Sequence, residues 1–142
     1  MDEAEQRLPS PHGEALGLVV VEQGAGRAIV TVPYSEQLVG DPETGVIHGG
    51  VLTTMLDNAS GMSIRSAEEM DGDTAIATLD LRIDYMRPAT PFLPITAEAE
   101  CYKRTRNIAF VRGTAYQADK NDPVATSVAA FMLGTPNQPR NQ

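Results

Sequence analysis

The chain is poor in cysteine, in basic residues and in long apolar runs, and each shortage excludes a class of protein. A single cysteine, Cys101, cannot form an internal disulfide, which is typical of a reducing compartment such as the cytoplasm. The formal net charge of −8 argues against a nucleic-acid partner, because that function needs a basic surface. No apolar run approaches the roughly 20 residues that span a bilayer, so no membrane partner is expected.

Cofactor and targeting signals are also missing. With two histidines, His12 and His48, the chain has no metal-ligand spacing, and it has no glycine pattern typical of a dinucleotide site or a P-loop. Its acidic start does not resemble a secretory signal, and its end matches no lipidation or peroxisomal address. The 142 residues are expected to form a single domain (1–142), with a core from about 14 to 134 and flexible ends.

The hydrophobic pattern predicts two strands followed by one long helix. Two β-branched runs, at 18–21 and 27–32, flank a polar turn and are typical of a hairpin. A loosely docked lead-in is expected over 1–12, and residues 33–47, which contain prolines and glycines, are expected to form a loop. From about 49 to about 67, apolar residues recur at helical spacing.

After residue 73 the hydrophobic period changes to two. Residues 77–86 alternate between apolar and polar, and this strand ends at Pro88. Three further strand-like runs, at about 95–102, 108–117 and 125–133, have short polar connections and predict an antiparallel meander. The tail from Thr135 is expected to be disordered. The order β-β-α-β-β-β-β predicts an α+β fold, in which a curved antiparallel sheet wraps the apolar helix.

An acid interrupts the apolar run of the expected helix. Removing the carboxylate of Asp57 from water costs several kcal/mol unless a partner compensates its charge. Gly49 and Gly50, ahead of this run, predict exposed N–H groups at a helix start, which suit an anion. A base beside an oxyanion hole is the minimum equipment for acyl transfer. The alternative is an acid on an exposed stripe, with glycines that only shape a tight turn.

Two motifs resemble those of the hotdog-fold acyl-CoA thioesterases. His48 to Gly50 (His-Gly-Gly) precedes Asp57, which is nine residues after the histidine, and Tyr85 to Ala89 (Tyr-Met-Arg-Pro-Ala) closes the first strand after the helix. With the element order over about 14–134, they resemble the phenylacetate-pathway (PaaI-like) and human thioesterase-superfamily-member-2-like branch. The resemblance implies a homodimer whose sheets join edge to edge, or a dimer of dimers, with active sites built from both chains.

The resemblance also implies roles for these residues. Asp57 of one protomer would face the His48 region of the other, either as general base for water or as a nucleophile that forms a mixed anhydride. Gly49 would donate its N–H to the thioester oxygen, aided by the helix dipole, and Gly50 would allow close approach of the backbone. His48 would fix the loop or touch the ligand, with a purely structural histidine as the alternative.

Two polar residues have less direct matches. Thr78, seven residues before Tyr85, matches a serine or threonine that holds the attacking water in the family. Simple alternation would place Thr78 on the polar face of its strand, unless a β-bulge or the dimer seam changes this. Some relatives have an asparagine or glutamine six residues before the histidine, where this chain has Pro42. Pro42 has no side-chain donor, so that contact is either missing or supplied elsewhere, with Asn58 as a candidate.

Basic residues cluster at 103–106. Arg104 and Arg106 are candidates for the coenzyme A phosphates, because the guanidinium fork suits phosphate, and Arg87 is a further candidate. The alternative is a solvated turn. Cys101 is expected to be a small buried hydrophobe rather than a nucleophile. Coenzyme A would be part of the substrate, so no separate cofactor and no metal are implied.

These observations favour hydrolysis of an acyl-CoA thioester. A non-catalytic acyl-CoA-binding module is the main alternative, and the presence of Asp57 disfavours it. A hotdog hydratase or dehydratase pairs a histidine with an acid on different motifs, and a purely structural β protein leaves the acid unexplained. The acyl group stays open between aryl-acetyl, benzoyl-type and medium-chain acyl groups.

Overall fold

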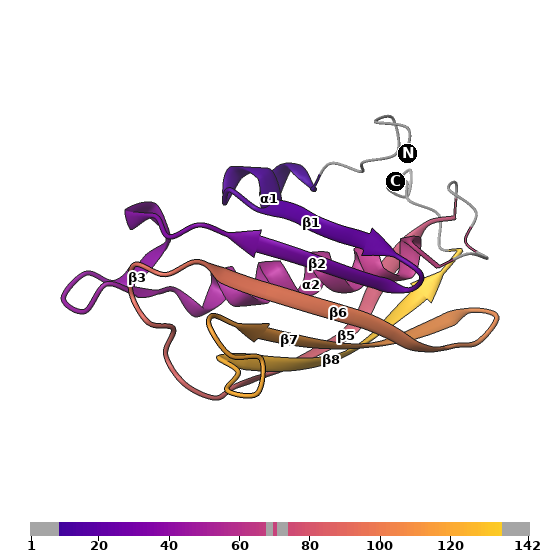
Figure 1. The fold of residues 1–142 in the computed structure, drawn as a ribbon. Coiled ribbons are helices and arrows are strands. Elements are labelled where there is room, and N and C mark those ends of the chain that lie inside the picture. Colours follow the sequence, from indigo (N-terminus) through magenta and orange to yellow (C-terminus); the bar gives the residue numbers. More distant parts are fainter. Residues whose placement is uncertain (1–8, 68–69, 71–73, 135–142) are drawn as a thin grey trace, which may run out of the picture.

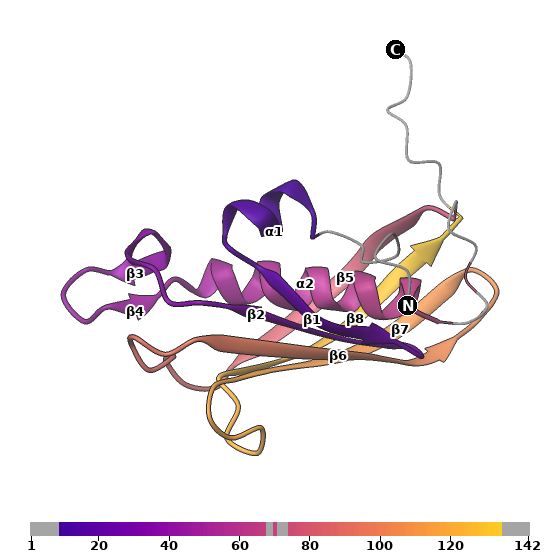
Figure 2. The same ribbon diagram turned by 45° about the horizontal axis from the view of Figure 1, so that its top comes forward.

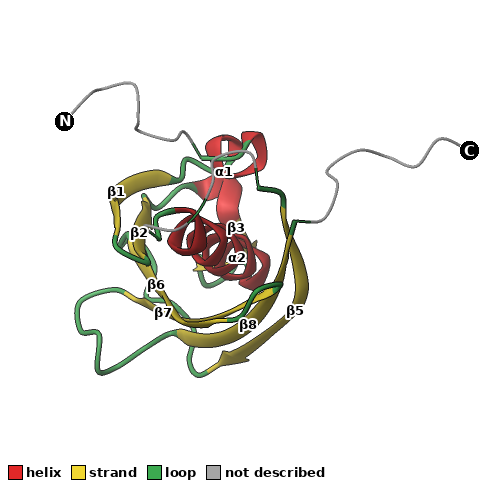
Figure 3. Cartoon of the chain, turned by 90° about the vertical axis from the view of Figure 1, so that its right-hand side faces the viewer, coloured by secondary structure: helices red, strands yellow, loops and turns green. Residues whose placement is uncertain are grey.

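One long helix lies in the curve of one antiparallel sheet (Figure 1). The computed structural model describes residues 9–67, 70 and 74–134. Helix α2 spans Gly49–Arg65, and the sheet has the strand order β1-β2-β6-β7-β8-β5. Viewed along α2, the strands curve around the helix from β1 to β5 (Figure 3). The α+β hotdog architecture predicted from the sequence is confirmed.

The strands follow the predicted runs closely. Strands β6, β7 and β8 form the antiparallel meander, and β1 and β2 form the hairpin. Strand β5, which follows the helix, pairs with β8 and is one edge of the sheet. The bounds are β1 Val19–Gly24, β2 Arg27–Val32, β5 Ile76–Tyr85, β6 Ile95–Arg104, β7 Ile108–Tyr116 and β8 Ala125–Leu133.

Two segments differ from the prediction. At the end of the expected lead-in and just beyond it, Pro11–Ala15 forms helix α1, which lies beside α2 (Figure 2). The expected loop contains the 3₁₀ turn η2 (Glu36–Leu38) and a hairpin of β3 (Val39–Asp41) and β4 (Val46–Ile47). These elements are too short to leave a hydrophobic period, so pattern alone does not reveal them. The expected flexible residues 1–8 and tail from Thr135 lie outside the described residues.

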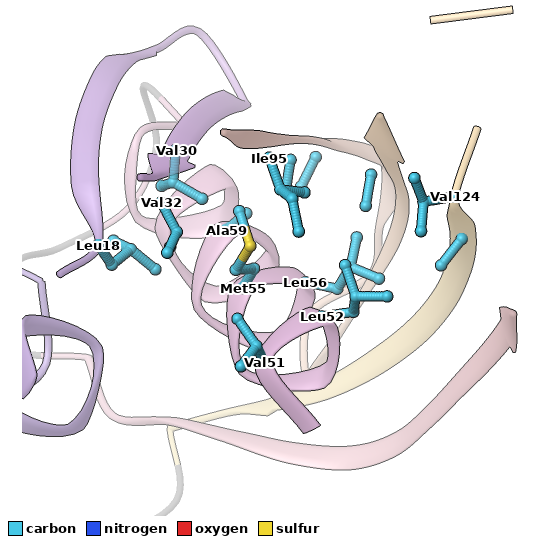
Figure 4. Packing of buried hydrophobic residues seen from close by; sticks show 14 of the residues in the cluster. Leu18, Val30, Val32, Val51, Leu52, Met55, Leu56, Ala59, Ile95 and Val124 are labelled. Carbon is cyan, nitrogen blue, oxygen red and sulfur yellow. The ribbon is translucent and has the colours of Figure 1, made fainter. Parts of the chain in front are cut away.

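The core fills the space between α2 and the concave face of the sheet (Figure 4). Met55, Leu56 and Ala59 of α2 are fully buried, as helical spacing on one stripe requires. Burying one large aliphatic side chain contributes about 1.5–3 kcal/mol, so this stripe fixes α2 on the sheet. Many of the buried residues that the sheet contributes to this core are small alanines beside larger ones such as Val30 and Ile95. The alanines are Ala97, Ala99, Ala109, Ala115, Ala125 and Ala129. No helix in the described ranges is long and apolar enough to cross a bilayer.

Candidate active site

The acid in the long helix faces an open cleft rather than the core. Asp57 is half-buried on α2, and its Oδ1 accepts a hydrogen bond of 3.0 Å from Thr78 Oγ1. Within the described parts of the chain, Oδ2 of Asp57 has no hydrogen-bond partner. The carboxylate is therefore held through one oxygen and open through the other.

A β-bulge in β5 turns Thr78 toward α2. The pairing of β5 with β8 shifts between Thr78 and Asp80, which makes Leu79 the extra residue. Leu79 is 52% exposed, whereas Leu81 packs against the core. The sequence-based expectation of regular alternation through Leu79 is therefore wrong. The bulge removes the conflict between strand alternation and a site role for Thr78.

The cleft beside Asp57 has a volume of about 370 Å³ and mixed walls. Its walls come from α2, from the residues at the start of α1, and from β1, β5 and β8. Such a volume falls within the range of small-molecule pockets, about 300–1,000 Å³. The lining residues are Pro9, Ser10, Gln23, Asp57, Asn58, Gly61, Met62, Arg65, Ile76 and Phe131.

The two glycines at the start of α2 have different uses. His48 is the N-cap residue, and its Nδ1 accepts a hydrogen bond of 2.8 Å from the Gly50 N–H. A Cβ on residue 50 would lie only 2.9 Å from this Nδ1, so the cap requires glycine there. The structure thus gives His48 the hydrogen bond that fixes the loop. The Gly50 N–H donates to this cap, so it is not available to a ligand.

The Gly49 N–H is the open donor of this turn. The His48 carbonyl accepts a hydrogen bond from Val51 N–H at 3.0 Å. The Gly49 carbonyl oxygen lies 3.4 Å from the hydroxyl oxygens of both Thr53 and Tyr85; these two hydroxyls bond to each other, and the one that accepts in that bond donates to the carbonyl. No described residue accepts a hydrogen bond from the Gly49 N–H. Two successive peptides are therefore held in place, and one N–H remains at the positive end of the helix. A fixed donor of this kind suits an oxyanion.

One chain does not bring its own base and donor together. Asp57 lies eight residues after Gly49 on α2, which corresponds to about 12 Å at 1.5 Å per residue. A reacting group must lie within about 3 Å of both the attacking group and the oxyanion donor. Each chain therefore holds two half-sites, one at the middle of α2 and one at its N-terminus.

Asn58 lies in the cleft wall, and its side chain is tied into the fold. Its Oδ1 accepts a hydrogen bond from Ser10 Oγ, and its Nδ2 donates to the Thr54 carbonyl, both at 2.8 Å. His12 adds a contact of 3.2 Å between Nε2 and Thr54 Oγ1. Asn58 thus fastens α1 to α2. The sequence did not suggest this role, because it did not predict α1.

The predicted phosphate-binding arginines lie away from the cleft. Arg104, at the end of β6, lines a second hollow of about 380 Å³ together with Lys103, Cys101 and Ala67. This hollow lies beyond the C-terminal end of α2, and Arg106 is exposed in the turn between β6 and β7. Within one chain, neither arginine lines the Asp57 cleft.

Two other candidates have clear structural roles. Arg87 binds the loop before β8, because its Nε lies 3.3 Å from Asp122 Oδ1 and its Nη2 donates to the Asp122 carbonyl. Burial raises the pKa of the Cys101 thiol above its ordinary value. The thiol therefore stays protonated near neutral pH, and Cys101 packs against the core as a small apolar residue.

Tyr85 contacts the donor turn, a role that sequence reasoning missed. Its hydroxyl lies 2.6 Å from Thr53 Oγ1, in addition to its contact with the Gly49 carbonyl. The ring packs on the first turn of α2, where a Cβ on residue 49 would lie 3.4 Å from Tyr85 Cε1. In the sequence, Tyr85 stands out only as part of a motif. Its contact with the donor turn joins a strand and a helix that are far apart in the sequence, so no local pattern predicts it.

The chain matches known proteins over most of its length. A family model described as Thioesterase superfamily matches residues 44–124, which include both half-sites. A crystal structure of a Pseudomonas aeruginosa protein is similar with a TM-score of 0.77 and 42% identity, covering 87% of this chain and 90% of that chain. A mutant of the phenylacetic acid degradation protein PaaI from Thermus thermophilus is similar with a TM-score of 0.74 and 25% identity, covering 87% and 98%. The medium/long-chain acyl-CoA thioesterase YigI of Salmonella typhimurium is 26% identical over 135 residues, which are 87% of this chain and 86% of that protein.

Proposed function

Since this chain belongs to the thioesterase superfamily, we propose that it hydrolyses acyl-CoA thioesters to a free acid and coenzyme A. The observation that carries the proposal is the Asp57 carboxylate, held by Thr78 at 3.0 Å and facing an open cleft. The free Gly49 N–H at the start of the same helix supports it. The similarity to YigI supports acyl-CoA as the thioester.

In this mechanism Asp57 activates water. Its free Oδ2 takes a proton from a water molecule, and the water oxygen bonds to the thioester carbon. The carbonyl oxygen gains negative charge, which a Gly49 N–H stabilises, and loss of such a donor typically costs about 2.7–4 kcal/mol. The C–S bond then breaks, and the leaving thiolate takes the proton from Asp57. In the alternative route an Asp57 oxygen bonds to the carbon, and the C–S bond breaks to release the thiolate, which takes a proton from solvent. Water then opens the resulting anhydride and gives the free acid and the Asp57 carboxylate.

A second copy of the chain would complete each site. The outer side of β5 has no partner strand among the described strands, and an unpaired edge is a template for pairing. Because β5 carries both Thr78 and Tyr85, pairing of two β5 edges would place the base of one chain near the donor of its partner. The proposed form is a homodimer, or a dimer of dimers, in the cytoplasm.

The cleft beside Asp57 is the proposed acyl pocket. Met62, Ile76 and Phe131 give it apolar walls, which suit an aryl or medium-length acyl group. Arg104 and Arg106 are the proposed contacts of the coenzyme A phosphates, because the arginine fork matches phosphate oxygens.

Thiol release from phenylacetyl-, benzoyl-, hexanoyl- and palmitoyl-CoA tests the proposal. Asp57→Asn is expected to lower turnover of the best substrate at least about 100-fold, because it removes the proton acceptor. Asp119→Asn is the matched control, since the Asp119 side chain accepts the Asn121 N–H in an exposed loop away from the cleft. Unchanged turnover in Asp57→Asn would contradict the mechanism. A folded wild type that binds these thioesters without releasing thiol would instead indicate the second candidate, an acyl-CoA-binding module.

A further inference from the structure

We propose that Tyr85 is a positioning residue that fixes the oxyanion donor Gly49. This inference rests on the proposed thioesterase function and assigns a residue to the donor half of its site. Tyr85 lies at the end of β5, and its hydroxyl contacts both the Thr53 Oγ1 and the Gly49 carbonyl. It is the point at which the edge strand bonds to the first turn of α2.

The donor turn needs such support from outside. Gly49 and Gly50 are consecutive residues without side chains, so the local backbone has unusual conformational freedom. His48 holds their shared peptide by its N–H, and the bonded pair of Thr53 and Tyr85 hydroxyls donates to its carbonyl. With both ends held, rotation about this peptide is restricted. The Gly49 N–H belongs to the preceding peptide, whose His48 carbonyl accepts from the Val51 N–H at 3.0 Å, so the two anchored peptides together fix its direction. A donor that is already held in the right direction stabilises the charge that develops on the oxyanion better than a mobile donor does.

The tyrosine ring adds a steric restraint. Its Cε1 would be 3.4 Å from a Cβ on residue 49, so the ring lies against the open face of Gly49. The apolar core does not supply this contact, because Gly49 precedes the first buried residue of α2, Val51. Tyr85, which is itself exposed, therefore packs on the donor turn outside the buried core.

The rest of the Tyr-Met-Arg-Pro-Ala motif anchors this tyrosine. The N–H groups of Met86 and Arg87 both donate to the Val124 carbonyl, at 2.8 and 3.3 Å. The Arg87 side chain binds Asp122 in the adjacent loop. The motif thus ties the end of β5 to the β7–β8 connection and fixes the base of the Tyr85 side chain. This gives a physical account of a sequence feature that the mechanism itself does not use.

Two variants separate the hydroxyl from the ring. Tyr85→Phe keeps the ring and is expected to lower kcat about fivefold, as expected for loss of one neutral hydrogen bond. Tyr85→Leu removes both contacts and is expected to lower kcat at least about 50-fold. KM should change less than about twofold in both, because a positioning residue does not touch the substrate. The matched control is Tyr116→Phe, whose hydroxyl donates to Glu98 on the outer side of the sheet.

A second measurement tests the rigidity of the donor turn independently of catalysis. Amide hydrogen exchange of the Gly50 N–H, which is bonded to His48 Nδ1 in the same peptide as the Gly49 carbonyl, should accelerate in Tyr85→Phe and not in Tyr116→Phe, because the donor turn loses a restraint. Thr53→Val acts on the same carbonyl, so its effect on kcat should be non-additive with that of Tyr85→Phe.

The outcomes separate this inference from the function on which it rests. A raised KM with unchanged kcat in Tyr85→Phe would mean that the tyrosine binds substrate, which overturns the positioning role. Unchanged kcat and unchanged exchange of the Gly50 N–H would overturn it as well. In both cases, turnover by the wild type would still support the thioesterase function. A wild type without turnover would overturn the proposed function and, with it, the role of Tyr85.

Discussion

The Thr78 hydroxyl is the one described side-chain contact of the proposed base. Thr78→Val keeps the shape of the side chain and removes the hydrogen bond to Asp57. A hydrogen bond to a charged group is worth about 1.5–3 kcal/mol, so kcat should fall ten- to a hundredfold. Steady-state thiol release measures this effect.

Thr78→Ser is the control for this prediction. Serine retains the hydroxyl, so it should keep most of the wild-type kcat. Equal activity of the valine and serine variants would show that the carboxylate needs no fixed orientation.

At the residue scale, the sequence predicts which side chains matter better than how each one is used. Asp57 and Gly49 were identified because an acid in an apolar helix and glycines at a helix start are unusual locally. The contacts of Asn58 with Ser10, and of Tyr85 with the donor turn, join segments far apart in the sequence. No local pattern encodes such contacts, so they required the three-dimensional structure.

At the scale of elements, helix α1 depends on its N-cap. Ser10 Oγ accepts the Gly13 N–H at 3.1 Å and donates to Asn58 Oδ1. Ser10→Ala removes both bonds, and loss of an N-cap typically costs about 1 kcal/mol. We expect faster amide hydrogen exchange at Gly13 and Leu16 in this variant.

The middle of α2 is the internal reference for this experiment. Its amides should exchange as in the wild type, because the core holds them independently of α1. Equal exchange at Gly13 in both proteins would show that other contacts hold α1.

Some elements have a hydrophobic period in their sequence, and others are too short to have one. Helix α2 and the six strands of the main sheet were predicted within a few residues, because each buries one face over two turns or more, or over several strand residues. Helix α1, β3 and β4 span five residues or fewer. Capping and contacts with other segments hold them, and these leave little trace in the sequence.

For the whole molecule, we expect lower stability at alkaline pH, because the thiol of Cys101 and the phenol of Tyr116, on neighbouring strands, both have raised pKa values. Burial raises the pKa of Cys101 above 9.0, and burial together with the charge of Glu98 raises the pKa of Tyr116 above 10.0. At a pH between the ordinary pKa of such a group and its raised pKa in the fold, the folded protein binds more protons than the unfolded chain. The free energy of unfolding should therefore decrease as the pH rises above about 9.

Urea unfolding from about pH 8 to about pH 10.5 measures this decrease. Cys101→Ala should flatten its first part and Tyr116→Phe its second, because each removes one titrating group. A free energy of unfolding that is constant over this range would contradict the prediction.

The bulge in β5 has a consequence for the whole design of the chain. Thr78 and Tyr85 are an odd number of residues apart, and an odd interval puts two side chains on opposite faces of a regular strand. Both contact α2, because the extra residue Leu79 restores an even count. If the bulge were straightened into regular pairing with the sequence unchanged, the odd interval would turn one of the two toward solvent, with every functional side chain still present. The base end and the donor end are kept in phase by a single exposed residue that belongs to neither.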